Sequence, residues 1–98
     1  MPYRDYRVYI VECTDGSYYT GASSDLEKRL AEHQQGAYPK NYTFTRRPVR
    51  LVWTEQFSRP KEMQDAEKQI KGWTHDKKRA LVKGDISLLK ELSKKRFS

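Results

Sequence analysis

The sequence predicts an α/β (α+β) fold, in which a small three-stranded, mainly antiparallel sheet is flanked by helices in the order β-β-α-β-α-α-α. Three observations support this prediction. Residues 6–22 have the pattern of two strands around a turn, residues 49–57 alternate between apolar and polar side chains, and the other segments have helical spacing or helix caps. The core should be small, because only 36% of the 98 residues are hydrophobic and 34% are charged.

The first two strands are expected to form a hairpin. Residues 6–13 are rich in β-branched and aromatic side chains, which favour strands. Asp15 and Gly16 form a strong hairpin signal, because such a turn needs a positive φ at its centre. Residues 17–22 then return as the second strand.

A helix is expected directly after the hairpin. Ser24 and Glu27 have the spacing of a capping box, in which each side chain accepts from the backbone amide of the other residue. Gly36 can adopt the left-handed conformation that ends many helices. The helix should therefore run to about Gln35.

The second half of the chain predicts one strand and three helices. A polar, basic loop over residues 37–47 leads to a strand over residues 49–57. One helix begins at Pro60, a second is capped by Thr74, and the last covers about residues 85–96. The helix after Pro60 has an apolar stripe at spacings of three and four residues, formed by Met63, Ala66, Ile70 and Trp73.

We expect a single domain over residues 1–98, because the sequence has no repeat, no low-complexity tract and no long linker. Cys13 is the only cysteine, which excludes an internal disulfide and a cysteine-rich zinc site. No apolar stretch approaches the ~18–20 residues of a membrane span, and the N-terminus lacks an apolar signal core. These features favour a cytoplasmic protein that does not enter the membrane.

The chain is strongly basic. It has 20 lysines and arginines against 13 acidic residues, a formal net charge of +7 and a pI near 9.6. A small domain of this charge attracts polyanions, of which nucleic acid is the commonest in the cell. A net charge also favours solubility by itself, and the composition fits both explanations equally.

Glu67 stands out by its position in the helix after Pro60. It lies four residues after Met63 and three before Ile70, which places it on or beside the apolar stripe. A carboxylate at the edge of a core costs free energy unless it is paired, exposed at a cleft or bound to a cation. An ion pair with Lys71 or Lys68 is the simplest explanation, and a functional carboxylate is the alternative.

The faces of the first strands and helix suggest a second cluster. Side chains alternate along a strand, so if Val8 and Ile10 face the core, Tyr9 faces the other way together with one residue of the neighbouring pair Tyr18 and Tyr19. Tyrosine is also favoured in strands for packing alone. The alternation is therefore compatible with a site of two phenols without establishing one.

Arg29 and His33 lie four residues apart and share one face of the first helix. Arg29 could neutralise a phosphate, and His33 could bond to that phosphate or to a nearby phenol. Alternatively, Arg29 belongs to a solvated face, and His33 interacts favourably with the helix dipole.

The loop over residues 37–47 interleaves aromatic and basic side chains, namely Tyr38, Lys40, Tyr42, Phe44, Arg46 and Arg47. Such side chains can stack on bases and hold phosphates. The aromatics could equally serve to fix the loop to the fold. The candidate nucleic-acid-binding residues are Tyr42, Arg46 and Arg47, together with Lys71.

The tripeptides Arg7-Val8-Tyr9 and Tyr19-Thr20-Gly21, followed by Arg29, His33 and Glu67, resemble the motifs of the GIY-YIG nuclease domain. The resemblance covers about residues 5–82, and the chain looks like one of the small stand-alone bacterial members. It implies that Tyr9 helps to deprotonate the attacking water and that Tyr19 lies beside the scissile phosphate. Gly21 corresponds to the closing glycine of the motif, where a side chain would crowd the strand-to-helix junction.

The resemblance also implies roles for the two helices. Arg29 falls at the arginine that stabilises phosphate charge, and His33 falls at a frequent helper. Glu67 falls at the glutamate that holds one divalent metal, usually Mg²⁺ or Mn²⁺. A tyrosine with a pKa near 10 is mostly protonated at neutral pH, so the residues alone leave the base open between Tyr9 and His33.

Three positions depart from the family pattern. Arg7 stands where the first motif has glycine, and Thr20 stands where the second motif has isoleucine. Many members carry an asparagine after the glutamate, and Arg79 lies at about that distance in this chain. The tyrosines, the arginine and the glutamate are all retained.

The leading hypothesis is therefore a metal-dependent endonuclease that hydrolyses DNA phosphodiester bonds with an activated water. The alternative is a non-catalytic nucleic-acid-binding module on the same fold. The resemblance favours DNA, with branched or damaged DNA among the candidates, and does not exclude RNA. A protein partner or a homodimer could direct the protein to its target.

Overall fold

The computed structural model describes residues 5–95 and contains one antiparallel sheet of three strands in that part of the chain. β1 (Tyr6–Glu12) lies in the middle, between β2 (Tyr18–Ser23) and β3 (Arg50–Phe57). The order of strands and helices along the chain agrees with the sequence prediction. The predicted three-stranded α+β fold is confirmed.

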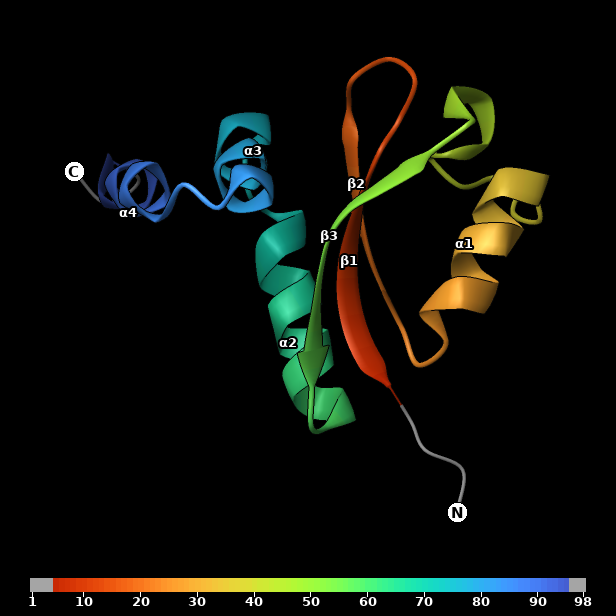
Figure 1. Ribbon diagram of the computed structural model, residues 1–98, viewed down its shortest axis with the longest axis horizontal. Helices are drawn as coiled ribbons and strands as arrows, with labels where there is room; N and C mark the ends of the chain where they lie inside the picture. Colours follow the sequence, from red (N-terminus) through yellow and green to blue (C-terminus); the bar gives the residue numbers. More distant parts are fainter. Residues whose placement is uncertain (1–4, 96–98) are drawn as a thin grey trace.

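The described part also contains four α-helices, and a 3₁₀ turn η1 precedes β3. Their bounds are α1 Leu26–Gln35, η1 Phe44–Arg46, α2 Pro60–Lys71, α3 His75–Lys83 and α4 Ile86–Lys95. Figure 1 shows α1 on one side of the sheet and α2 on the other, with α3 beside the end of α2 and α4 farthest from the sheet. The sheet thus separates an α1 face from an α2 face.

The hairpin turn is one residue longer than a two-residue turn. The amide of Gly16 donates to Cys13 O (3.0 Å), and the amide of Cys13 donates to Ser17 O (2.9 Å). Gly16 has a φ of +83°, which a residue with a side chain rarely adopts. This pattern is a three-residue loop with a glycine bulge, so β2 begins at Tyr18.

The predicted start of α1 at Ser24 is wrong by one residue. Asp25 is the N-cap, and its side chain accepts from the amide of Lys28 (3.1 Å). β2 continues to Ser23, whose hydroxyl accepts from the amide of Asp25 (2.9 Å), and this contact delays the first helical turn. The predicted stop is confirmed, because Gly36 is left-handed with a φ of +74°.

The sheet has a separate buried cluster on each face. One cluster lies between the sheet and α2 and contains Val8, Ile10, Met63 and Ile70. The other lies on the α1 face and contains Tyr9, Val11, Cys13 and Val49. Tyr18 packs against the first cluster and Tyr19 against the second. The expected alternation along β1 is confirmed, and it brings Tyr9 and Tyr19 to the same face.

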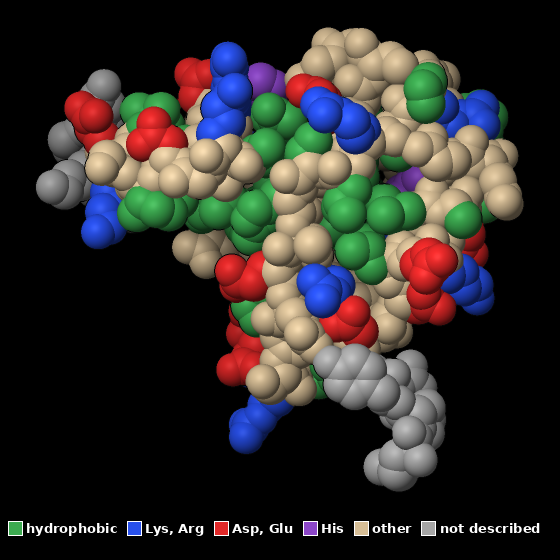
Figure 2. Space-filling view, viewed as in Figure 1, with side chains coloured by type: hydrophobic (Ala, Val, Ile, Leu, Met, Phe, Trp, Pro, Cys, Tyr) green, Lys and Arg blue, Asp and Glu red, His purple; other side chains and the backbone are tan. Residues whose placement is uncertain are grey.

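The outer surface mixes charges of both signs with apolar groups. Figure 2 shows hydrophobic side chains in a band across the visible face, with lysine, arginine and acidic side chains around it. Ile86 and Leu88 are exposed. No helix within residues 5–95 is long and apolar enough to cross a membrane.

Candidate active site

The centre of the candidate site is a buried hydrogen bond between the sheet and α1. Tyr9 is 0% exposed at the middle of β1, and His33 is 3% exposed in the last turn of α1. The Oη atom of Tyr9 lies 2.9 Å from Nε2 of His33. A buried phenol and a buried imidazole are therefore satisfied by each other.

Further hydrogen bonds give this contact a direction. Asn41 Oδ1 accepts from the amide of Thr43 (2.9 Å) and from its hydroxyl (2.8 Å), so the one hydroxyl proton of Thr43 points to Asn41. Thr43 Oγ1 lies 3.0 Å from Nδ1 of His33 and must accept from it. The other ring nitrogen, Nε2, then carries a lone pair and accepts the proton of Tyr9.

The same network reaches the second tyrosine of the motif. The Nδ2 atom of Asn41 donates to Oη of Tyr19 (3.2 Å). Tyr9 and Tyr19 are thus joined by a chain of hydrogen bonds through His33, Thr43 and Asn41. Thr43 and Asn41 were not among the predicted site residues, because both interpretations of the loop over residues 37–47 rested on its aromatic and basic side chains.

One sequence signal could have pointed to these two residues. Asn41 and Thr43 are two positions apart in a loop, where an amide side chain commonly binds the backbone two residues on. Thr43 is only 1% exposed, which is unusual for a loop threonine. Its contact with His33, ten residues away, is visible only in the folded protein.

The electrostatic surroundings agree with the direction of the hydrogen bond. Burial raises the pKa of the Tyr9 phenol well above its ordinary value, and the neighbouring Tyr19 raises it further, although Arg29 lowers it in part. Burial lowers the pKa of His33, and the cation of Arg29 lowers it further. At neutral pH the phenol is protonated, and the imidazole is neutral and ready to accept.

Acidification is expected to lower the free energy of unfolding through His33. The unfolded chain protonates this histidine near pH 6.5, whereas the folded protein, in which the pKa of His33 is lowered, takes up the proton only at a lower pH. This stabilisation is present above about pH 6.5 and is lost as the pH falls toward the folded-state pKa. Thermal unfolding midpoints measured between about pH 8 and about pH 5 check the effect.

Two histidine variants control this measurement. His33→Gln should flatten the pH dependence below about pH 6.5, because it removes the group whose pKa differs between the two states. His33→Asn should flatten it in the same way, because it also lacks a titratable side chain. An unchanged dependence in His33→Gln would contradict the prediction.

Arg29 is held at the edge of the same cluster. Its Nε atom lies 3.4 Å from Oε1 of Glu32, and its guanidinium lies 5.6 Å from the centre of the Tyr38 ring. Tyr38 donates its hydroxyl proton to the same oxygen of Glu32 (2.6 Å). The Arg29 side chain is 38% exposed, so its charge can reach an incoming anion. Tyr38 and Glu32 fix the orientation of that charge.

Glu67 approaches the tyrosines from α2. Its carboxylate lies 3.2 Å from Nζ of Lys71 and is 24% exposed, so the predicted ion pair with Lys71 is confirmed. Lys71 Nζ in turn lies 6.0 Å from the centre of the Tyr19 ring. The negative charge of Glu67 also raises the pKa of Tyr9. The carboxylate is therefore near Tyr9 as well as paired with Lys71.

The oxygen ligands available to a metal are few. No group of three or more histidine, cysteine or acidic side chains within residues 5–95 could hold a metal ion. Glu67 is a single hard oxygen donor that is partly open to solvent, and Mg²⁺ is often bound by one carboxylate, waters and substrate phosphate. This donor set fits Mg²⁺ or Mn²⁺ and does not fit a zinc site.

Comparison with known proteins decides the family. A family model described as the GIY-YIG catalytic domain matches residues 5–80. The chain belongs to the GIY-YIG family. A UPF0213 protein of Staphylococcus saprophyticus is 45% identical over 75 residues, which cover 76% of this chain and 90% of that protein. A UPF0213 protein of Staphylococcus aureus (strain Mu3) is 45% identical over 76 residues, which cover 78% and 92%.

Solved structures also match this GIY-YIG chain. The solution structure of a UPF0213 protein from Bacillus halodurans has a TM-score of 0.53 at 39% identity, over 81% of this chain and 83% of that one. A solution structure of a protein from E. faecalis has a TM-score of 0.59 at 34% identity, over 84% and 86%. Membership in this nuclease family implies nucleic acid as the class of substrate, while the names of the relatives state no activity.

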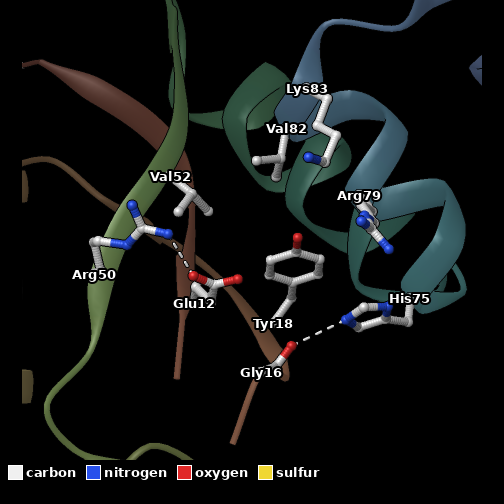
Figure 3. Close-up of a pocket in the computed structure, with 9 residues that line it drawn as sticks. All are labelled: Glu12, Gly16, Tyr18, Arg50, Val52, His75, Arg79, Val82 and Lys83. Atoms are coloured by element: carbon white, nitrogen blue, oxygen red, sulfur yellow. Dashed lines mark hydrogen bonds and ion pairs between the residues drawn. The ribbon is translucent and has the colours of Figure 1, made fainter. Parts of the chain in front are cut away.

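The three departures from the GIY-YIG pattern lie outside the hydrogen-bonded cluster. Arg7 forms an ion pair with Asp5 (2.7 Å). Thr20 is buried opposite Ile10, on the face of β2 that points away from Tyr19. Arg79 lines a hollow on the α2 face and therefore does not stand in for an asparagine of the tyrosine site (Figure 3).

The two loop arginines of this GIY-YIG chain contact their own fold. Arg47 donates to the carbonyl oxygens of Phe44 (2.7 Å) and Gln34 (3.3 Å), which satisfies the end of α1. Arg46 pairs with Asp15 (3.0 Å). The loop is thus held by its own side chains, as one of the two sequence interpretations expected.

Tyr42 and Arg46 nevertheless lie next to the candidate site. The guanidinium of Arg46 lies 3.7 Å from the centre of the Tyr42 ring. That ring is exposed and stacks on Tyr19 at 6.4 Å and 15°. Nucleic-acid binding by Tyr42, Arg46, Arg47 and Lys71 stays a prediction. Two nitrogens of each arginine already donate to groups inside the fold.

Proposed function

We propose that this protein is a metal-dependent endonuclease that hydrolyses DNA phosphodiester bonds with an activated water. The directional hydrogen bond from Tyr9 to neutral His33 supports this proposal most strongly. Arg29 and Glu67 add a cation and a metal-binding carboxylate beside the same phenol. A nucleophile activator and charge stabilisers within one cluster suit hydrolysis of a phosphodiester.

The residues of the site can pass a proton without forming a free phenolate. As a water attacks phosphorus, its proton moves to Oη of Tyr9 while the phenolic proton moves to Nε2 of His33. The resulting imidazolium keeps its Nδ1–H bond to Thr43. This coupled transfer answers the difficulty that the pKa of Tyr9 is raised, because the negative charge never rests on the buried oxygen.

Arg29 and Glu67 act on the charge that develops at the phosphate. Arg29 would donate to a non-bridging oxygen, where the transition state becomes more negative. Glu67 would hold Mg²⁺ or Mn²⁺, with phosphate oxygens and waters as the other ligands. When bound, such an ion supplies Lewis-acid stabilisation of the leaving oxygen.

The test of this function removes one hydroxyl group. Tyr9→Phe should lower the rate of cleavage about 100-fold or more, because general acid–base groups contribute roughly 10²–10⁴-fold. Tyr6→Phe is the matched control, since Tyr6 packs on the other face of the sheet. Supercoiled plasmid and branched DNA in Mg²⁺, Mn²⁺ or EDTA measure the rates.

Two outcomes would contradict the proposal in different ways. Equal rates for Tyr9→Phe and the wild type would remove Tyr9 from the reaction. Absence of cutting by the wild type in every metal, with DNA still bound, would favour the non-catalytic binding module. Branched DNA, damaged DNA and RNA are compared as substrates in the same assay.

We also propose that the protein is cytoplasmic and that it acts as a homodimer or together with a partner that directs it to its target.

A further inference from the structure

A basic hollow lies on the α2 face of the sheet, away from Tyr9 and His33. We call it the α3 hollow and define it by Tyr18, Arg50, His75, Arg79 and Lys83. The hollow has a volume of about 300 Å³. It lies between α3, the turn of the β1–β2 hairpin and the first residues of β3. Figure 3 shows these side chains around the opening, with Val52 and Val82 on its walls.

The α3 hollow has an excess of positive charge. His75, Arg79 and Lys83 are spaced by four residues along α3, so they follow one face of the helix toward the hollow. Glu12 is the acidic residue of the lining, and it already pairs with Arg50 (2.5 Å). No ion pair within residues 5–95 neutralises Arg79 or Lys83. A concave site with unneutralised cations attracts an anion.

An aromatic pair lies beside these cations. The rings of Tyr18 and His75 are stacked, with centres 4.6 Å apart and planes 13° apart. His75 Nε2 donates to the carbonyl oxygen of Gly16 (3.1 Å), which holds the imidazole in place. A fixed aromatic surface next to basic side chains is the arrangement that binds bases and phosphates of a single strand.

The α3 hollow continues toward the candidate active site. A neighbouring hollow of about 300 Å³ at the edge of β2 is lined by Tyr18, Tyr19, Tyr42, Lys71 and Lys78. Tyr18 lines both hollows, and β2 is an edge strand, so no further strand of the described sheet lies across this route. Burial and the nearby cation of Lys71 both lower the pKa of Lys78.

We propose that the α3 hollow binds the phosphodiester backbone of a single strand that leaves the active site around the edge of β2. Arg79 and Lys83 would bind phosphates, and the Tyr18–His75 pair would stack on a base. A flexible single strand can bend from the α1 face to the α2 face, whereas a rigid duplex cannot follow this edge. The identity of the polyanion rests on the proposed function.

The test compares the length of DNA that the protein can bind. Glu67→Gln serves as the background, so that bound DNA is not cut. Fluorescein-labelled single strands of about 4 and about 16 nucleotides, the range of one single-strand site, are titrated by anisotropy. The variant Arg79→Ala plus Lys83→Ala removes two cations from the hollow. Its charge-matched control, Arg59→Ala plus Lys61→Ala, removes two cations at the opposite end of α2.

The hollow variant should bind the long strand roughly tenfold more weakly at low salt, and the control should not. Its slope of log K against log salt should be shallower by about 1.4, because each phosphate contact on a single strand contributes about 0.7. The short strand, which occupies the active site alone, should bind both variants equally. The more conservative pair Arg79→Gln plus Lys83→Gln should repeat these results, because it retains the long side chains on α3.

Equal binding of the long strand by the hollow variant and its control would overturn the inference. The same loss for short and long strands would also overturn it, because the hollow would then not extend the binding site. The proposed function is judged separately by cleavage. If the wild-type protein shows the length-dependent binding but never cuts DNA, the proposal for the α3 hollow stands and the proposed nuclease activity is contradicted.

Discussion

Replacing Glu67 by glutamine is expected to lower the rate of DNA cleavage by about 1,000-fold or more. The neutral amide is a poor ligand for Mg²⁺, and the Lewis-acid contribution of a bound metal is worth several kilocalories per mole. The fold should remain, because the partly exposed pair of Glu67 with Lys71 contributes only about 0–1 kcal/mol. Activity and stability should therefore separate in this variant.

The assay uses supercoiled plasmid with protein and either Mg²⁺, Mn²⁺ or EDTA, alongside thermal unfolding of each protein. Glu62→Gln is the matched control, since it makes the same change in the first turn of α2. Wild type and control should cut only with metal, and Glu67→Gln should not cut. Cutting by all three proteins at one rate would contradict the role of Glu67 as a metal ligand, provided that Tyr9→Phe, purified in the same way, cuts more slowly.

Replacing Gly21 by alanine is expected to damage both the site and the fold. Gly21 is the direct partner of Tyr9 across the β1–β2 ladder. An added Cβ would lie 2.5 Å from Cζ of the Tyr9 ring and closer still to its Oη. The phenol would have to move away from His33, because a buried ring has little free space.

This overlap corrects the expectation that a side chain at Gly21 would crowd the strand-to-helix junction. The nearest atoms to such a side chain all belong to Tyr9, so the glycine makes room for the phenol itself. We expect a loss of about 1–3 kcal/mol of unfolding free energy, which is typical of overpacking. Cleavage should fall about 100-fold, as for loss of the Tyr9 hydroxyl.

Gly72→Ala is the matched control for this variant. Gly72 has a φ of −81°, and the nearest atom to an added Cβ is the carbonyl oxygen of Gln69 at 3.5 Å, which is ordinary contact. Thermal unfolding and plasmid cleavage should be close to those of the wild type. Full cleavage activity and an unchanged free energy of unfolding in Gly21→Ala would contradict the prediction, because Tyr9 would then have room to accept the added methyl group.

Local patterns in the sequence were sufficient for the elements that depend on near neighbours. The strand and helix periods placed α2 and β3, and Gly36 ended α1 as expected. The position of Glu67 beside an apolar stripe predicted a carboxylate at the edge of the core, and its side chain is indeed partly buried and paired with Lys71. These features follow from spacing along the chain, which tertiary contacts rarely overturn in long periodic segments.

Local patterns did not decide every cap and loop position, because short polar side chains have several partners within reach. Ser24 and Asp25 can each cap a helix, and the length of β2 selected Asp25. Arg46 and Arg47 have the same side chain, yet one borders the site beside Tyr42 and the other binds the end of α1. No local pattern distinguishes them.

The sequence by itself determined the order of the elements, the reacting groups available, and that Tyr9 shares a face with one residue of the pair Tyr18 and Tyr19. The structure decided that this residue is Tyr19. Only the tertiary structure decided that Thr43 and Asn41 connect the two phenols through His33. It also separated Arg79 from the tyrosine site and placed it in the α3 hollow. The physical reason is that hydrogen bonds and charges act over a few ångströms in space, and these residues become neighbours only when distant segments fold together.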